Sequence, residues 1–218
     1  MAQLKACLFD LDGVIVDTAK YHYLAWKRLA DELGFVFTEH DNERLKGVSR
    51  VRSLEILLEI GGISRSEEEK AMMATRKNEW YVDYIKSMDE SEILPGVTEF
   101  LASLKANGIK IALGSASKNA GMILTNIGMM DTFDAIIDGN KTSEAKPDPE
   151  VFLLGAEALG VAAEECVVFE DAEAGVEAAI RAHMHVIGIG SPEQLAAADF
   201  TIKQFTELTL KQVQDLFN

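Results

Sequence analysis

Short apolar segments of strand length recur along this chain, and helical patterns separate the later ones. These segments are ACLF at 6–9, IKIALGS at 109–115, FDAIID at 133–138, ECVVFE at 165–170 and HVIGI at 185–189. Pro149 can open a helix between two of them, and Gly160 can end it. Strands that alternate with helices form parallel sheets covered on both faces. We therefore predict an α/β fold with a doubly wound, mostly parallel sheet.

Residues 17–88 interrupt this alternation with a succession of helical patterns. Tyr23, Trp26 and Leu33 share one face of a helix that Gly34 would end. Ser66, followed by Glu69 three residues later, is typical of a capping box at a helix start. A chain of 218 residues is long enough for a core and an insert. We expect a helical cap at 17–88, inserted after the first strand of an α/β core that residues 1–16 and 89–218 form.

Acidic residues dominate the charge of the chain. It has 36 Asp or Glu against 21 Lys or Arg, a net charge of −15, and so repels nucleic acid and anionic membrane surfaces. Segment 17–90 holds 12 Lys or Arg and 15 Asp or Glu, a net charge of −3, whereas the remainder has −12. We expect neither a nucleic-acid partner nor a membrane partner, but a small anion can bind where the cations of the insert gather.

The two cysteines, Cys7 and Cys166, each lie within an apolar segment. This position is typical of buried free thiols rather than of a disulfide or a metal site. Reduced thiols suit the cytoplasm, and no apolar run approaches the length of about 20 residues that a membrane span needs. We expect a cytoplasmic monomer without a signal peptide.

Acidic side chains follow two of the predicted strands. Asp10 and Asp12 come after ACLF and precede Gly13, and Glu170 and Asp171 end the segment ECVVFED. Asp and Gly are also common turn residues, so either pair alone could be an ordinary strand exit. In an open parallel sheet, however, ligands bind at the carboxyl ends of the strands. Two acidic pairs at that edge would repel each other, so we predict a magnesium ion between them.

Two further segments are suited to binding a phosphate. In GSASKN at 114–119, small hydroxyl residues and backbone N–H groups precede a helix start, although Ser and Asn are also ordinary N-caps. In AKPDP at 145–149, Lys146 beside Pro147 can neutralise a phosphoryl group, or it can be a solvated loop lysine.

Together these segments resemble a known family. DLDGV, GSAS, Lys146-Pro147 and Glu170-Asp171 occur in the order of the four motifs of the haloacid dehalogenase-like phosphotransferase superfamily, and the resemblance covers the whole chain. It implies that Asp10 is a nucleophile that forms an aspartyl phosphate and that Asp12 is the general acid and base. It implies a magnesium shell of Asp10, the main-chain carbonyl of Asp12, Glu170 and Asp171. The phosphoryl group would lie among Ser115, Ala116 and Lys146.

Within this family the sequence resembles the sugar-phosphate mutases, through LKGVSR at 45–50, RKN at 76–78 and IALGSASKN. That resemblance implies the interconversion of β-D-glucose 1-phosphate and D-glucose 6-phosphate through β-glucose 1,6-bisphosphate. Arg50 would grip the phosphate that is not transferred, and His22, with Thr18 and Lys77, would help Asp12 to move. The other substrate-binding residues would be Trp26, Lys46, Gly47, Val48 and Ser49 of the cap and Ser117, Lys118 and Asn119 of the core.

Other interpretations stay open at this point. KGVSR could be an interhelical turn with solvated charges, His22 a structural helix residue and Trp26 a core residue. A magnesium-dependent sugar-phosphate phosphatase would use the same core, and a non-catalytic phospho-receiver module also clusters acids, a hydroxyl and a lysine at strand ends. Ala172 stands where the family commonly has Ser, and residues 138–145 are less typical of the family.

Overall fold

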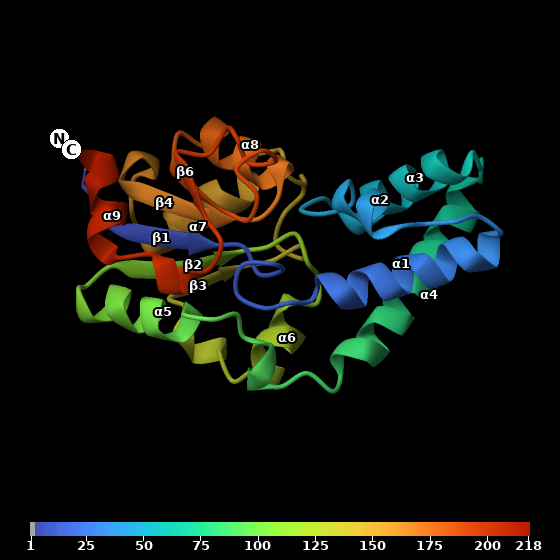
Figure 1. Cartoon of the computed structure of the whole chain (residues 1–218), viewed down its shortest axis with the longest axis horizontal. Coiled ribbons are helices and arrows are strands. Elements are labelled where there is room, and N and C mark those ends of the chain that lie inside the picture. Colours follow the sequence, from blue (N-terminus) through green and yellow to red (C-terminus); the bar gives the residue numbers. More distant parts are fainter. Residues whose placement is uncertain (1–2) are drawn as a thin grey trace.

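A computed structural model of the protein describes residues 3–218 (Figure 1). Its centre is a six-stranded sheet in the order β3-β2-β1-β4-β5-β6, and every ladder in it is parallel. The strands are β1 (Ala6–Phe9), β2 (Lys110–Gly114), β3 (Ala135–Ile137), β4 (Cys166–Glu170), β5 (His185–Ile189) and β6 (Phe200–Ile202). The predicted doubly wound α/β fold is confirmed, since the chain winds from β1 toward β3 on one side and from β4 toward β6 on the other.

Helices cover both faces of the sheet (Figure 1). On one face lie α5 (Val97–Ala106), α6 (Ala120–Asn126) and α9 (Leu210–Gln214), and on the other lie α7 (Glu150–Leu159) and α8 (Glu173–Arg181). Within β1, Cys7 and Phe9 pack on the first face and Leu8 packs on the second. Successive strand residues point to opposite faces, so a strand covered on both sides has to be apolar throughout. Both cysteines are buried free thiols, as predicted.

Four helices between β1 and α5 form a second lobe, the cap (Figure 1). They are α1 (Ala19–Leu33), α2 (Glu39–Glu43), α3 (Arg50–Gly61) and α4 (Glu67–Ile85). Trp26, Leu29 and Leu57 belong to a buried cluster of the cap itself. The domain limits at 17 and 88 remain a prediction. Within residues 3–218, short 3₁₀ turns occur at η1 (Glu90–Glu92), η2 (Met130–Thr132), η3 (Ala163–Glu165), η4 (Phe205–Glu207) and η5 (Asp215–Phe217).

Two segments connect the core to the cap, and they are bound to each other. The Asp17 N–H donates to the Glu92 carbonyl over 3.2 Å, and the Leu94 N–H donates to the Ile15 carbonyl over 2.9 Å. The Glu92 carboxylate accepts hydrogen bonds from Lys20 Nζ and Tyr21 Oη, each 2.7 Å long. The cap is therefore attached through one paired connection. Among the residues described here, no helix is long and apolar enough to cross a membrane.

Candidate active site

The central strands end at one edge of the sheet, and the predicted acidic residues meet there. Phe9 is in register with Leu113 of β2 and Phe169 of β4. The Asp10 N–H donates to the Phe169 carbonyl over 3.0 Å, which fixes Asp10 directly beside the end of β4. The order of the strands reverses between β1 and β4, and crevices at such points bind ligands in open α/β sheets.

Gly13 allows the two acidic segments to approach each other. It has a φ of 82°, and a Cβ atom at this position would lie 2.2 Å from Asp171 Oδ2. Any side chain would therefore clash with the Asp171 carboxylate, besides being strained in this backbone conformation. Glycine after Asp12 lets the loop bring Asp10, Asp12 and Asp171 into one site.

Lys146 is buried among the carboxylates. Its Nζ lies 2.6 Å from Asp10 Oδ1 and 2.5 Å from Glu170 Oε1, and it donates to the Gly114 carbonyl over 3.0 Å. Burial alone would favour the neutral amine, but Asp10 and Glu170 raise the pKa of Lys146 above its ordinary value. The lysine therefore stays charged, and it orients the Asp10 carboxylate.

Negative charge exceeds positive charge at this edge. Burial and the proximity of Asp10, opposed by Lys146, raise the pKa of Glu170 to about 7. Burial, together with Glu170 and Asp10, raises the pKa of Asp171 well above its ordinary value. Lys46 of the cap is the cation found within 4.0 Å of Asp171 among the described residues, with its Nζ 3.9 Å from Asp171 Oδ2. Such a set of oxygen donors suits a hard divalent cation.

The described residues nevertheless contain no group of three or more His, Cys, Asp or Glu side chains placed as a complete metal site. Glu170 already binds other groups, because Oε2 accepts hydrogen bonds from the Asp171 and Ala172 N–H groups at 2.9 and 3.1 Å. The set Asp10, Asp12, Glu170 and Asp171 that the sequence indicated is thus brought together, and its role toward a metal stays a prediction.

The turn after β2 is shaped by its own hydroxyl groups. Ser115 is fully buried, and its Oγ accepts a hydrogen bond from the Ser117 N–H over 3.1 Å. Ser117 Oγ in turn accepts from the Asn119 N–H over 3.2 Å. Ala116 lies between these two serines and lines the cavity described below. The turn stands beside Lys146, whose Nζ bonds to the carbonyl of Gly114, the residue before Ser115.

Asp12 faces the cap. Thr18 Oγ1 donates a hydrogen bond to Asp12 Oδ1, and His22 Nε2 lies 3.8 Å from the same oxygen. Burial and, next, the charge of Asp10 raise the pKa of Asp12 to about 6. An acid of this strength can both donate and accept a proton near neutral pH.

Lys77 and the aromatic rings of the cap surround His22. Lys77 Nζ lies 3.0 Å from His22 Nδ1 and 4.4 Å from the centre of the Trp26 ring. His22 stacks on Tyr81, with 4.1 Å between ring centres. Burial and the charge of Arg50 lower the pKa of Lys77 to about 7, and burial and Lys77 lower the pKa of His22 well below its ordinary value. His22 is therefore neutral at pH 7.

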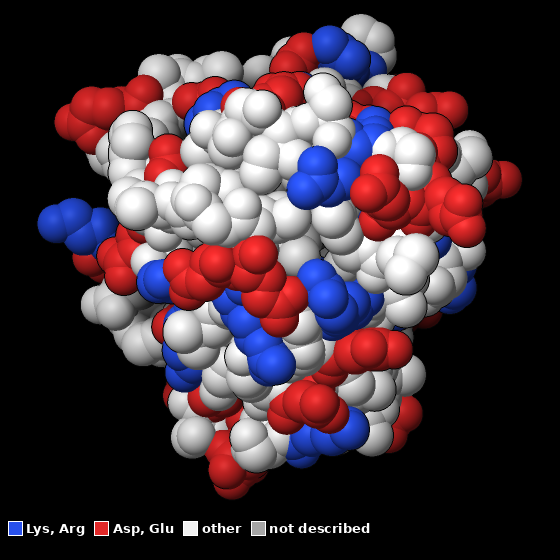
Figure 2. All heavy atoms as spheres, turned by 90° about the vertical axis from the view of Figure 1, so that its right-hand side faces the viewer, with Lys and Arg blue, Asp and Glu red and all other residues white. Residues whose placement is uncertain are grey.

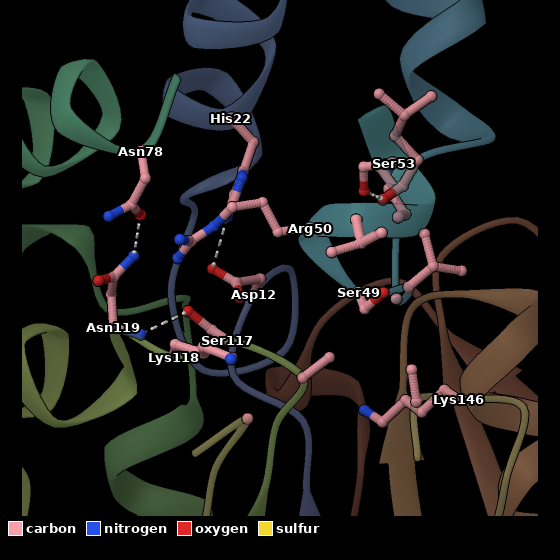
Figure 3. Close-up of a pocket in the computed structure, with 18 of the residues that line it drawn as sticks. Asp12, His22, Ser49, Arg50, Ser53, Asn78, Ser117, Lys118, Asn119 and Lys146 are labelled. Atoms are coloured by element: carbon pink, nitrogen blue, oxygen red, sulfur yellow. Dashed lines mark hydrogen bonds and ion pairs between the residues drawn. The ribbon is translucent and has the colours of Figure 1, made fainter. Parts of the chain in front are cut away.

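A cavity of about 530 Å³ lies between the cap and the core. Figure 3 shows Arg50 and His22 extending from the cap, with Ser117, Lys118 and Asn119 of the core on the opposite wall. The predicted residues that line it are Asp10, Asp12, His22, Trp26, Lys46, Gly47, Val48, Ser49, Arg50, Lys77, Ala116, Ser117, Lys118, Asn119, Lys146 and Asp171. Thr18, Ser115 and Glu170 instead lie buried behind the wall, where they bind residues that face the cavity.

The structure adds lining residues that the sequence analysis did not single out for the site. Asn78, Tyr81, Asn42 and Ser53 line the cavity on its cap side. Asn78 immediately follows Lys77 in the RKN segment, so its position in that segment was the one signal that could have indicated it.

Several cations on the outer surface of the cap are paired with acids. Arg52 bonds to Glu55 and Glu59, and Arg76 bonds to Glu32. In the view onto the outer end of the cap, blue and red side chains therefore alternate rather than form one basic patch (Figure 2). Arg50 lines the cavity instead, and no ion pair within 4.0 Å is found for it in the described part of the chain. The cap thus offers this cation to the cavity.

Comparison with known proteins agrees with this architecture. Residues 4–183 match the family model of the haloacid dehalogenase-like hydrolases, and the protein belongs to this family. It is similar to the β-phosphoglucomutase of Bacillus subtilis (strain 168), with 42% identity over 97% of this chain and 95% of that protein.

A solved structure and a second relative extend the comparison. The crystal structure of β-phosphoglucomutase from Clostridium difficile superimposes with a TM-score of 0.93 and 44% identity, and covers 99% of this chain and 97% of that one. The phosphorylated carbohydrates phosphatase of Thermotoga maritima is 35% identical over 81% of this chain and 80% of that protein. The enzymes named in these comparisons are thus of two kinds, β-phosphoglucomutases and a phosphatase of phosphorylated carbohydrates. The comparisons therefore suggest two related activities, a mutase and a phosphatase.

Proposed function

We propose that this protein is a phosphomutase that interconverts β-D-glucose 1-phosphate and D-glucose 6-phosphate through β-glucose 1,6-bisphosphate. One observation carries the proposal: the cavity has the Asp10–Lys146 pair on the core side, while Arg50 of the cap and Lys118 of the core lie elsewhere on its walls. A bisphosphate needs two separate phosphate sites in one cavity. The similarity to two β-phosphoglucomutases supports the same conclusion.

The side chains suit a double transfer through an aspartyl phosphate. A carboxylate oxygen of Asp10 would attack phosphorus as the bond from phosphorus to the sugar oxygen breaks, so that one difficult transfer becomes two. Asp12 would give its proton to the departing sugar oxygen, and it would later take the proton of the sugar hydroxyl that attacks the aspartyl phosphate. Lys146 and the backbone N–H groups of the turn at 115–119 would offset the charge on the phosphoryl oxygens.

Magnesium belongs to this proposal as the cofactor. Asp10, the main-chain carbonyl of Asp12, Glu170 and Asp171 would hold it, because the cluster has an excess of buried carboxylates over cations. When bound, the ion supplies positive charge to the phosphoryl oxygens. The partner would be a small phosphorylated sugar rather than a macromolecule, and we propose a cytoplasmic location.

A phosphatase is the second candidate, because the phosphorylated carbohydrates phosphatase is 35% identical. The two activities differ in the acceptor of the phosphoryl group, which is a sugar hydroxyl in the mutase and water in the phosphatase. Cap closure would exclude water and so favour the sugar hydroxyl. A second phosphate contact at Arg50 would favour the mutase, since a phosphatase for a monophosphate has no need of it.

The test is product analysis with β-D-glucose 1-phosphate and a catalytic amount of β-glucose 1,6-bisphosphate. We expect glucose 6-phosphate to form, and phosphorus NMR can monitor its formation. If glucose and inorganic phosphate are the only products, the phosphatase is correct and the mutase is wrong. Asp10→Asn should abolish turnover; a protein that never turns over any sugar phosphate would instead match a phospho-receiver.

A further inference from the structure

One hydrogen bond crosses the cavity from the cap to the core. Asn119 Nδ2 donates to Asn78 Oδ1 over 2.9 Å (Figure 3). Asn78 belongs to α4 of the cap, whereas Asn119 is the residue before α6 of the core, and both line the cavity. The bond therefore depends on where the cap lies relative to the core.

On the core side this bond continues into the turn at 115–119, which would face the phosphoryl group in the proposed function. The Asn119 N–H donates to Ser117 Oγ, and the Ser117 N–H donates to Ser115 Oγ. Ser115 is itself fixed, because its N–H donates to the Ile137 carbonyl over 3.0 Å at the end of β3. A short chain of hydrogen bonds thus runs from Asn78 in the cap to the buried end of β2.

On the cap side, Asn78 lies next to the residues around Asp12. Lys77, the preceding residue of α4, contacts His22, and His22 lies 3.8 Å from Asp12. Successive residues of an α-helix are rotated by about 100°, so Lys77 and Asn78 contact different neighbours from one turn of α4. The part of α4 that contains Lys77 and Asn78 therefore contacts both the surroundings of Asp12 and the turn at 115–119.

We propose that Asn78 is a positioning residue that links the position of the cap to the turn at 115–119. The proposal rests on the proposed mutase function, in which this turn forms one wall of the phosphate site. Through the bond to Asn119, Asn78 holds the cap in place over the phosphorylated enzyme and excludes water. The phosphoryl group can pass from Asp10 to a sugar hydroxyl or to water. In both cases the bond between phosphorus and Asp10 breaks, and the oxygen of the acceptor forms a new bond to phosphorus. The proton of the acceptor passes to Asp12. Asn78 biases this choice toward the sugar hydroxyl.

The first test compares Asn78→Ala with the wild type. A single neutral hydrogen bond makes a modest net contribution, so we expect kcat/KM for glucose 6-phosphate formation to fall by about three- to tenfold. We expect the ratio of inorganic phosphate to glucose 6-phosphate to rise by a similar factor, and the hydrolysis of acetyl phosphate not to fall. Glu79→Ala, which alters the exposed next residue of α4, serves as the matched control and should change neither quantity.

The product ratio separates positioning from a general structural defect. A variant with fewer correctly folded molecules loses both products together, so an unchanged ratio in Asn78→Ala would overturn the proposal. The urea midpoint of unfolding, measured on the same samples, should differ little from that of the wild type.

A double-mutant cycle tests whether Asn78 acts through Asn119. If it does, Asn78→Ala should add no more than about a twofold loss in the Asn119→Ala background, because the bond is already absent there. If the two losses multiply instead, Asn78 acts on the substrate by itself and the proposal is wrong. A wild-type protein that forms no glucose 6-phosphate overturns the proposed function together with this inference. A wild type that forms it, combined with an unchanged Asn78→Ala ratio, overturns the inference alone.

Discussion

At the scale of single residues, the buried ammonium of Lys146 holds two buried carboxylates. Its Nζ lies within 2.6 Å of Asp10 Oδ1 and 2.5 Å of Glu170 Oε1, and all three side chains are almost completely buried. Removing one partner of a buried ion pair leaves the other charge without compensation. The geometry that prepares Asp10 for attack therefore also contributes to the stability of the fold.

We predict that Lys146→Ala lowers the free energy of unfolding by about 3 kcal/mol at pH 7, measured by urea denaturation without divalent cations. The loss should shrink as the pH falls below about 7, the pKa of Glu170, because a protonated Glu170 needs no counter-ion. Sugar-phosphate turnover should fall by about a hundredfold or more, since a charge that stabilises the transition state is removed.

Lys211→Ala is the control for that prediction. Lys211 of α9 is exposed and pairs with the half-exposed Asp215 of η5, so its removal should leave the unfolding curve almost unchanged. An equally small change in Lys146→Ala would mean that the fold does not depend on the charge of Lys146, contrary to the stabilising role given to its two ion pairs.

The sequence predicted where most of the site residues lie along the chain, but not how they contact one another. Asp10 and Glu170 could be placed together because the carboxyl ends of neighbouring parallel strands meet at one edge. The contact between Asn78 and Asn119 was not predictable, because it joins two lobes and depends on how the cap is oriented. Thr18 and Ser115 were named for the site, yet local spacing does not reveal that they lie behind the cavity wall.

At the scale of elements, end signals were more informative than periodicity alone. Gly34 ends α1 with a φ of 86°, and Ser66 begins α4 with the expected capping box. The five-residue helix α2 and the three-residue strand β6 were not predicted. Segments this short contain too few residues for a periodic pattern, and β6 pairs on only one side, at the sheet edge.

The paired connection between the lobes is the element on which cap motion would depend. Its Glu92 carboxylate accepts hydrogen bonds from Lys20 and Tyr21 at the start of α1, and the Lys20 bond is the main reason that the pKa of Glu92 is lowered. A carboxyl group whose pKa is lower in the folded state stabilises the fold above its unfolded pKa, about 4.3 for Glu. That stabilisation disappears as the pH falls through the lowered value.

We therefore predict that Glu92→Gln lowers the free energy of unfolding at pH 7. The expected decrease is about 0.5–1 kcal/mol, because the ion pair with Lys20 is partly exposed to solvent. The difference from the wild type should vanish in strongly acidic solution, which thermal unfolding between pH 7 and pH 3 can follow. Glu90→Gln changes an exposed residue of the same turn and is the matched control. A difference that persists or grows in acid would contradict the role given to the Glu92 carboxylate.

At the scale of the whole molecule, the distribution of charge explains how an acidic protein can bind a phosphorylated substrate. The chain carries a net charge of −15, and the acidic excess lies mainly outside segment 17–90. Several surface cations of the cap are paired with acids (Figure 2), and five other cations line the cavity from both lobes: Lys46, Arg50, Lys77, Lys118 and Lys146. The cavity thus has cations from both lobes on its walls, and only the assembled pair of lobes presents them together.

Arg50 tests this arrangement, because it belongs to the cap while Asp10 belongs to the core. If Arg50 binds the phosphate that is not transferred, Arg50→Ala should lower kcat/KM for the mutase reaction by about ten- to a hundredfold, as expected for the loss of a charge-assisted contact. Hydrolysis of acetyl phosphate, which has no second phosphate, should stay within about twofold of the wild type. Arg52→Ala is the matched control on the same helix, since Arg52 pairs with Glu55 and Glu59 outside the cavity. Equal losses in both reactions would show that Arg50 supports the core chemistry itself, and the two-lobed phosphate site would then be wrong.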